Sequence, residues 1–191
     1  GGFNVAAFSR DEKERLAALY RKRGPDGAWN PEGPWVPQVD HLSNGIPTAL
    51  PDDANYTPGT NGAQFSPQGG ARLSLQGLEA LALLLLSDGQ VGDTRLLSQA
   101  RVADLREPAW RYDPVQPNRD GYAGQLHLRT AGLRIISGMT PSDRLFADDE
   151  RHWYGHFGEA YGLLAGVWVQ PESGQGVIYA ITGTAFDPYG S

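Results

Sequence analysis

The fold of this chain is decided by residues 153–183, whose sequence is WYGHFGEAYGLLAGVWVQPESGQGVIYAITG. Three segments of this stretch, at 153–158, 163–170 and 177–183, are rich in aromatic and β-branched residues, as strands are. Residues 171–174, PESG, have the composition of a hairpin turn. The last two segments are apolar at nearly every position, which predicts strands that are buried on both faces of a sheet.

Upstream of this stretch the sequence predicts helices and loops. The SRDE sequence at 9–12 forms a capping box, and the leucines after it predict a helix over about 9–23. Ser74 and the leucine-rich run behind it predict a second helix over 74–87, because Ser is a preferred N-cap residue. A shorter helix is expected over 98–106. Residues 24–70 are dense in Pro, Gly, Asn and Asp and predict a long loop, of the kind that often forms the wall of a site.

Together these elements predict one α+β domain over 1–191, with helices and loops in 1–120 and sheet strands in 121–185. The first of those strands is expected over 122–129, and the sheet is expected to be antiparallel. The chain starts at Gly1 rather than Met, which we interpret as the result of processing or trimming of a longer chain.

Composition excludes several classes of function. The chain has 191 residues, a net charge of −6, two lysines and no cysteine. Without a basic surface, binding to nucleic acid is not expected. Without cysteine, neither a disulfide framework nor a Cys-based zinc site is possible. The longest strongly apolar run is far shorter than the roughly 20 residues that a transmembrane helix needs, so no membrane span is predicted.

The most chemically dense part of the chain is 148–159, where His152 and His156 are four residues apart among carboxylates. On a helix this spacing converges on one metal ion. Along a strand, four residues span about 13 Å, whereas a zinc–nitrogen bond is about 2 Å long. The aromatic and glycine content of this part favours a strand, so we predict no metal and no other cofactor.

A self-sufficient nucleophilic hydrolase is hard to build from this chain. It contains no Ser-x-x-Lys, no Tyr-x-Asn, no Gly-x-Ser-x-Gly elbow and no cysteine. Taken alone, His156 is more simply a structural or surface histidine. The glycines beside it, Gly155 and Gly158, nevertheless allow another backbone or a ligand to approach closely.

Two segments, taken in order, resemble the C-terminal half of the serine β-lactamase-like family. This family includes class C β-lactamases, family VIII carboxylesterases and D-amino-acid peptidases. The first segment, FSPQGGARLSLQGL at 65–78, is similar to the family's loop and capped helix. The second, GHFGEAYG at 155–162, continues with VWVQPE at 167–172 and GVIYAITG at 176–183. It resembles the family's Lys/His-x-Gly strand and the hairpin that follows. The resemblance implies the C-terminal part of a β-lactamase-like fold, so that residues 1–191 would form a single incomplete domain.

The resemblance assigns catalytic roles to two positions. His156 is the first residue of the Lys/His-x-Gly motif, which directs hydrogen bonds and positive potential towards the catalytic network or a substrate carboxylate. The backbone amide of Glu159 would complete an oxyanion hole together with the amide of the nucleophilic serine. A donor of this kind typically stabilises the transition state by about 3 kcal/mol.

Four further positions are implied to contact substrate. Phe157 and Gly158 belong to the strand along which the substrate would lie, and Gly158 gives it room. Gln68 and Gly69 would line the rim of the acyl pocket, although a simple turn before the helix explains these two residues equally well.

The chain also departs from the family. The Ser-x-x-Lys and Tyr-x-Asn motifs and the first strands of the sheet are absent, and His156 stands where class C β-lactamases have lysine. The resemblance therefore implies a serine hydrolase acting on an ester, amide or β-lactam, with the nucleophile supplied by an N-terminal portion or chain. The alternatives are a catalytically inactive binding or structural subunit, and an unrelated β-rich binding module.

Overall fold

The computed structural model describes residues 8–37, 71–118, 121, 124–160 and 162–184. The architecture is α+β with antiparallel strand pairing, as the sequence predicts. The chain forms two compact units: unit 1 contains residues 1–77, 159–163 and 181–191, and unit 2 contains residues 78–158 and 164–180. In the described part of the chain, no helix has the length and apolar character that crossing a bilayer requires.

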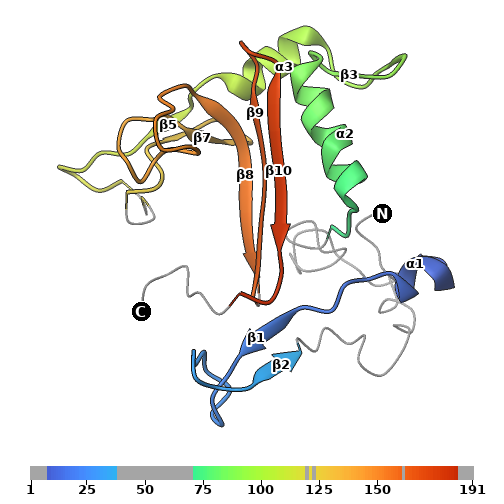
Figure 1. The fold of residues 1–191 in the computed structure, drawn as a ribbon. Helices are drawn as coiled ribbons and strands as arrows, with labels where there is room; N and C mark the ends of the chain where they lie inside the picture. The colour runs from blue at the N-terminus through green and yellow to red at the C-terminus, as the bar shows by residue number, and fades with distance from the viewer. Residues whose placement is uncertain (1–7, 38–70, 119–120, 122–123, 161, 185–191) are drawn as a thin grey trace, which may run out of the picture. The chain divides into compact units, whose positions relative to one another are not determined.

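A six-stranded sheet organises unit 2, although residues 159–160, 163 and 181 at the ends of its long strands are assigned to unit 1. Its strands are β5 (Trp110–Arg111), β6 (Leu128–Arg129), β7 (Arg134–Ile136), β8 (Trp153–Ala160), β9 (Leu163–Gln170) and β10 (Gln175–Ile181). Strand neighbours in the sheet are also neighbours in the chain, so the strands form an uninterrupted meander. The three long strands, β8, β9 and β10, lie side by side (Figure 1). They confirm the three strands predicted from the 153–183 stretch.

The short strands at the other side of the sheet are less visible in the sequence. β5 and β7 contain two and three residues, too few for an alternating pattern to emerge. The strand predicted over 122–129 is wrong in length, because β6 contains only Leu128 and Arg129. Gly124 has a φ of 82° and forms part of a turn, in which the Gly124 and Leu126 amides both donate to the Gly121 carbonyl at 3.1 Å.

The turn between β9 and β10 lies at residues 171–174, as predicted. Gly174 has a φ of 67°, and its amide donates to the Pro171 carbonyl at 3.2 Å. The prediction that both strands are buried on both faces holds for the second half of β9 but is wrong for β10. β10 is an edge strand, and Ile181 at its end is 53% exposed.

Two helices accompany the sheet in unit 2, and both were predicted. α2 (Leu75–Leu86) begins after Ser74, whose Oγ accepts from the Gly77 amide at 3.2 Å. α3 (Gln99–Arg106) begins after Ser98, whose side chain accepts from the Arg101 amide at 3.3 Å. In both cases the serine satisfies a backbone donor that the first helical turn leaves without a partner.

The end of α2 depends on a glycine. Gly89 has a φ of 90°, and its amide donates to the Leu84 carbonyl at 2.7 Å. A Cβ at Gly89 would lie 2.2 Å from the Leu97 carbonyl oxygen, so this stop requires glycine. Between the two helices, β3 (Gln90–Val91) and β4 (Thr94–Arg95) form a small hairpin.

The helices are tied to each other and to the sheet. The Arg106 side chain of α3 donates to the Leu85 carbonyl of α2 and lies 3.5 Å from the Asp88 carboxylate. A Cβ at Gly176 of β10 would lie 3.6 Å from the Leu86 side chain and 3.9 Å from Ala82. Figure 1 shows α2 running alongside β10. The buried apolar side chains of unit 2 are Ala82, Val102, Leu126, Leu128, Ile135, Trp153, Trp168 and Val169.

Unit 1 contains the main departure from the sequence prediction. The helix predicted over 9–23 is wrong: α1 is limited to Arg10–Glu14, and Tyr20–Lys22 forms strand β1, which pairs with β2 (Trp35–Pro37). The capping box itself is confirmed, because Ser9 Oγ accepts from the Glu12 amide at 3.2 Å and the Ser9 amide donates to the Glu12 carboxylate at 2.9 Å. Strand pairing overrides the helical spacing of the leucines.

Candidate functional site

Strand β8 presents its motif residues to two different faces. His156 and Gly158 are exposed, whereas Phe157 between them is half-buried. Its ring lies 6.3 Å from the Trp168 ring of β9 and 3.9 Å from the Arg134 guanidinium of β7. This is the period-two alternation of a strand. His156 and Gly158 therefore share one face, and the Phe157 side chain belongs to the other.

The two glycines that flank the histidine serve different purposes. A Cβ at Gly155 would lie 2.0 Å from the Val167 carbonyl oxygen, so glycine is required for the close approach of β8 to β9. A Cβ at Gly158 would meet no atom within 4 Å. The backbone approach expected from the sequence occurs at Gly155, and the open space occurs at Gly158.

The His156 imidazole has one nitrogen engaged. Nδ1 lies 2.6 Å from the Phe157 carbonyl oxygen, and because a carbonyl only accepts, Nδ1 is the donor. In the neutral ring Nε2 then carries the lone pair. The pKa of His156 is lowered, mainly because its surroundings desolvate the charged form and also through the positive charges of Arg134 and Arg129. This direction favours the neutral imidazole at pH 7, with Nε2 as an acceptor.

Replacing Arg134 with glutamine is expected to raise the pKa of His156, because the change removes one of the positive charges that disfavour the imidazolium. The measurement is an NMR titration of the His156 ring proton. Arg101→Gln is the matched control, since Arg101 pairs with Asp104 on the exposed surface of α3. An equal shift in both variants would mean that the effect is not local to His156.

Of the three other predicted site residues, only Glu159 lies in the described part of the chain. Glu159 follows Gly158 in β8, so its backbone amide lies next to the open position. Gln68 and Gly69 lie outside the residues that the structure describes. The described part of the predicted site is therefore a single strand segment, 156–159.

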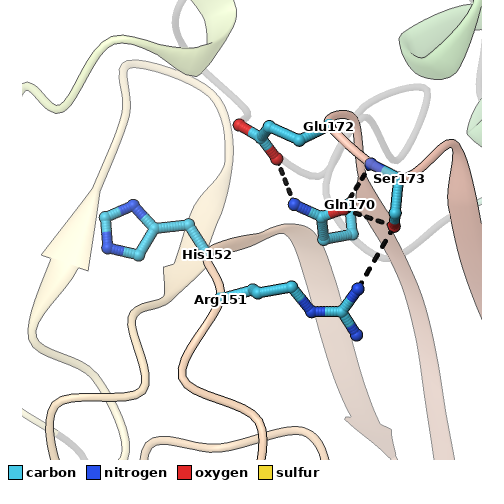
Figure 2. A pocket seen from close by; sticks show the side chains of 5 residues that line it. All are labelled: Arg151, His152, Gln170, Glu172 and Ser173. Carbon is cyan, nitrogen blue, oxygen red and sulfur yellow. Dashed lines mark hydrogen bonds between the residues drawn. The ribbon is translucent and has the colours of Figure 1, made fainter.

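A pocket at the opposite end of β8 escaped the sequence analysis. It has a volume of about 350 Å³ and is lined by Arg151, His152, Gln170, Glu172 and Ser173. Figure 2 shows the Arg151 side chain reaching toward Ser173 in the turn after β9, whereas the His152 ring points away from that turn. Only His152 drew attention in the sequence. The turn that carries Glu172 and Ser173 was recognised, but not its closeness to Arg151.

Most polar groups around this pocket bind one another. The Arg151 guanidinium donates to both Asp149 carboxylate oxygens at 2.8 Å, and also to Gln175 at 2.9 Å and Ser173 at 3.3 Å. The pKa of Asp149 is strongly lowered, chiefly by its hydrogen bonds to Arg151. Gln170 is buried, accepts from the Ser173 amide at 2.7 Å and donates to Glu172. This network holds the turn after β9 in place, and a purely structural role accounts for it.

The metal reading of His152 and His156 finds no support in this geometry. His152 lines the pocket before β8 begins, whereas His156 lies on the open face of the strand. Among the described residues, no group of three or more His, Asp or Glu side chains is placed to hold a metal ion.

The sequence also showed no sign of a second polar cluster, which surrounds Asp143. Asp143 is 1% exposed and binds three groups through Oδ2: His127 Nδ1 at 3.2 Å, the Ser137 amide at 3.2 Å, and the Ser137 hydroxyl. The Asp143 carbonyl also accepts from the Gly138 amide at 2.8 Å. Because the Ser137 hydroxyl is buried and binds Asp143 rather than His127, this arrangement is not an accessible Ser–His pair. It anchors the loop that follows β7.

Comparison with protein-family models, with curated proteins and with solved structures gives no match to this chain.

Proposed function

We propose that this chain is the C-terminal portion of a serine hydrolase of the β-lactamase-like type, which acts together with an N-terminal portion carrying Ser-x-x-Lys and Tyr-x-Asn. The observation that carries the proposal is the exposed strand segment of β8, with a histidine, an open glycine position and a backbone amide in succession. A strand of this form gives a substrate carbonyl space beside the histidine.

The chemistry would be acyl transfer through a covalent intermediate. The serine oxygen of the N-terminal portion gives its proton to a base and attacks the carbonyl carbon of an ester, amide or β-lactam. The tetrahedral intermediate then collapses to the acyl-enzyme, and the bond from the carbonyl carbon to the alcohol oxygen or amine nitrogen breaks. The alcohol or amine takes up a proton and leaves, or in a β-lactam stays attached to the opened ring. The Glu159 amide and the serine's own amide hold the oxyanion. Water then releases the acyl group as a carboxylic acid. Neutral His156 accepts a hydrogen bond or a proton at Nε2, so its contribution is basicity rather than positive charge.

Exposed apolar surface on this chain supports the proposal that a further polypeptide portion covers it. α2 is rich in leucine, yet Ala82 is its only buried residue, and Leu81 and Leu83 are each 44% exposed. A helix that is apolar around most of its circumference is normally buried. In the described part of the sheet, β10 has β9 as its single neighbour, and an open edge strand is a site for further pairing. We therefore expect the isolated chain to be poorly stable.

Gly158→Val tests the open face. The substitution is expected to lower kcat/KM for p-nitrophenyl acetate or nitrocefin at least tenfold, because the side chain fills the space assigned to substrate while meeting no atom of the fold. The assay uses native material, purified with everything that accompanies the chain. Ala131→Val is the matched control, since Ala131 is an exposed residue of the turn between β6 and β7. Equal activity of the two variants would show that substrate does not bind at this face.

The alternative is a catalytically inactive binding or structural subunit. One observation favours it: within the described residues, the hydrogen bond recorded for the His156 ring goes to a backbone carbonyl and not to a catalytic side chain. Native material that contains a partner polypeptide but hydrolyses neither substrate would support this second reading.

A further inference from the structure

Strand β8 loses its pairing with β7 just before the candidate site. Arg134 lies opposite Gly155, and this is the last registered pair of the two strands in the direction of the β8 end. His156, Phe157 and Gly158 follow directly in β8. In the described part of the sheet, backbone pairing with β7 therefore does not hold this segment.

The Phe157 side chain ties the segment to both neighbouring strands instead. Its ring centre lies 3.9 Å from the Arg134 guanidinium of β7 and 6.3 Å from the centre of the Trp168 ring of β9. A cation within about 6 Å of a ring centre is attracted to the ring, and a tilted aromatic pair at this separation is favourable. Trp168 is buried and offers a fixed surface. The Phe157 ring is therefore held by side chains from the strands on either side of β8.

The backbone of Phe157 binds the histidine side chain. The Phe157 carbonyl accepts from His156 Nδ1 at 2.6 Å. The hydrogen bond made by one imidazole nitrogen sets which of the two carries the proton of the neutral ring. The bond at Nδ1 therefore leaves the lone pair on Nε2, at a different corner of the ring. Gly158, on the same face as His156, leaves open space there, because a Cβ at this position would meet no atom within 4 Å.

From these contacts we propose that Phe157 is a positioning residue for His156, because its clamped ring holds in place the carbonyl that keeps the imidazole proton on Nδ1. Ring and carbonyl belong to one residue, so a restriction on the ring also restricts rotation of the peptide group that follows it. The Phe157 ring lies on the face opposite His156 and Gly158, so Phe157 acts through His156 rather than on substrate.

The catalytic consequence rests on the proposed function, in which Nε2 of His156 accepts a hydrogen bond or a proton. A histidine with its proton on Nε2 would present a donor at that place and could not act as the acceptor. Loss of the clamp should therefore lower kcat and leave KM little changed, because the open face at Gly158 keeps its space for substrate.

The test is NMR of nitrogen-labelled native material at neutral pH, where correlations between the ring protons and the ring nitrogens of His156 show which nitrogen carries the proton. We expect Nδ1 to carry it in the unmodified protein. Phe157→Ala removes the ring and both of its contacts, and should lower the ratio of the Nδ1–H to the Nε2–H tautomer at least threefold. It should also lower kcat for p-nitrophenyl acetate at least tenfold, which is part of a general acid–base contribution. Phe157→Tyr keeps the ring and should retain both the tautomer and the activity.

Phe146→Ala is the matched control. It removes an exposed ring that lies 5.6 Å from the ring of buried Trp153, and should change neither the tautomer nor kcat. Circular dichroism of each variant shows whether it is folded. If Phe157→Ala does not fold, Phe157→Leu carries the test, because leucine keeps an apolar side chain against Trp168 but gives up the ring contact with Arg134.

Three outcomes would overturn the proposal: a proton on Nε2 in the unmodified protein, an unchanged tautomer ratio in the folded Phe157 variant, or an equal change in Phe146→Ala. The NMR measurement needs no turnover. If native material hydrolyses neither p-nitrophenyl acetate nor nitrocefin, the proposed function fails, while the tautomer ratio still decides whether Phe157 positions His156. An unchanged ratio in active material would remove the role of Phe157 and leave the proposed function intact.

Discussion

Replacing Gly155 with alanine is expected to lower the unfolding free energy by about 3 kcal/mol, at the upper end of the usual cost of overpacking. The new Cβ would lie 2.0 Å from the Val167 carbonyl oxygen and 2.9 Å from the Trp168 Cα. Both atoms belong to the backbone of β9, which cannot move aside without breaking its pairing with β8. The clash therefore falls on the centre of the sheet.

The measurement is thermal unfolding of native material, in which such a loss corresponds to a fall in Tm of roughly 6–12 °C. Gly158→Ala is the matched control, because it adds the same atom to the same strand where nothing lies within 4 Å. The control is expected to stay within about 0.5 kcal/mol of the unmodified protein. Equal Tm values for the two alanine variants would contradict the close approach of β8 and β9 at Gly155.

His156→Ala is expected to lower kcat/KM of the assembled hydrolase by about 10²–10³, within the range of general acid–base contributions. The unmodified protein should also lose activity as pH falls. Because the pKa of His156 is lowered from its ordinary value of about 6.5, the neutral and active form persists to a pH below 6.5. Activity should then decline as pH falls through the shifted pKa.

That acidic decline should be absent from the residual activity of His156→Ala. His152→Ala is the control and should retain full activity, since His152 lines the pocket at the other end of β8. Unchanged turnover in His156→Ala would show that His156 takes no part in the reaction. The same protonation affects stability: a folded-state pKa below the unfolded value favours folding above about pH 6.5 and loses that contribution as pH falls.

The sequence predicted an element correctly where its pattern was long or where a single local interaction defined it. The strand pattern of β9 extends over eight residues, and its bounds agree with the prediction. The helix starts at Ser74 and Ser98 follow from a single side chain bonding to a nearby amide. Such signals are local, so neighbouring sequence is sufficient to recognise them.

The failures come from contacts between distant residues. Tyr20–Lys22 has helical spacing but pairs with Trp35–Pro37, where Lys22 Nζ lies 5.5 Å from the centre of the Trp35 ring. β10 is as apolar in sequence as β9, but its place at the edge of the sheet leaves it exposed. Neither outcome can be obtained from a sequence window, because each depends on which segment lies alongside.

The same difference between local signals and contacts of distant residues applies to the candidate site. The sequence identified His156 and the two glycines beside it, but not that Gly155 serves the backbone and Gly158 the open face. Arg129 and Arg134 have no motif around them. Their pairing depends on the register of two strands of two and three residues, and their influence on His156 appears only in the folded chain.

The most direct test of the central proposal is intact-mass analysis of native material after brief incubation with a fluorophosphonate probe for nucleophilic serines. The proposal predicts a polypeptide portion that carries Ser-x-x-Lys, accompanies this chain and gains one probe adduct on that serine. Native material in which this chain is monodisperse and folds cooperatively, with no such companion portion and no adduct, would contradict it.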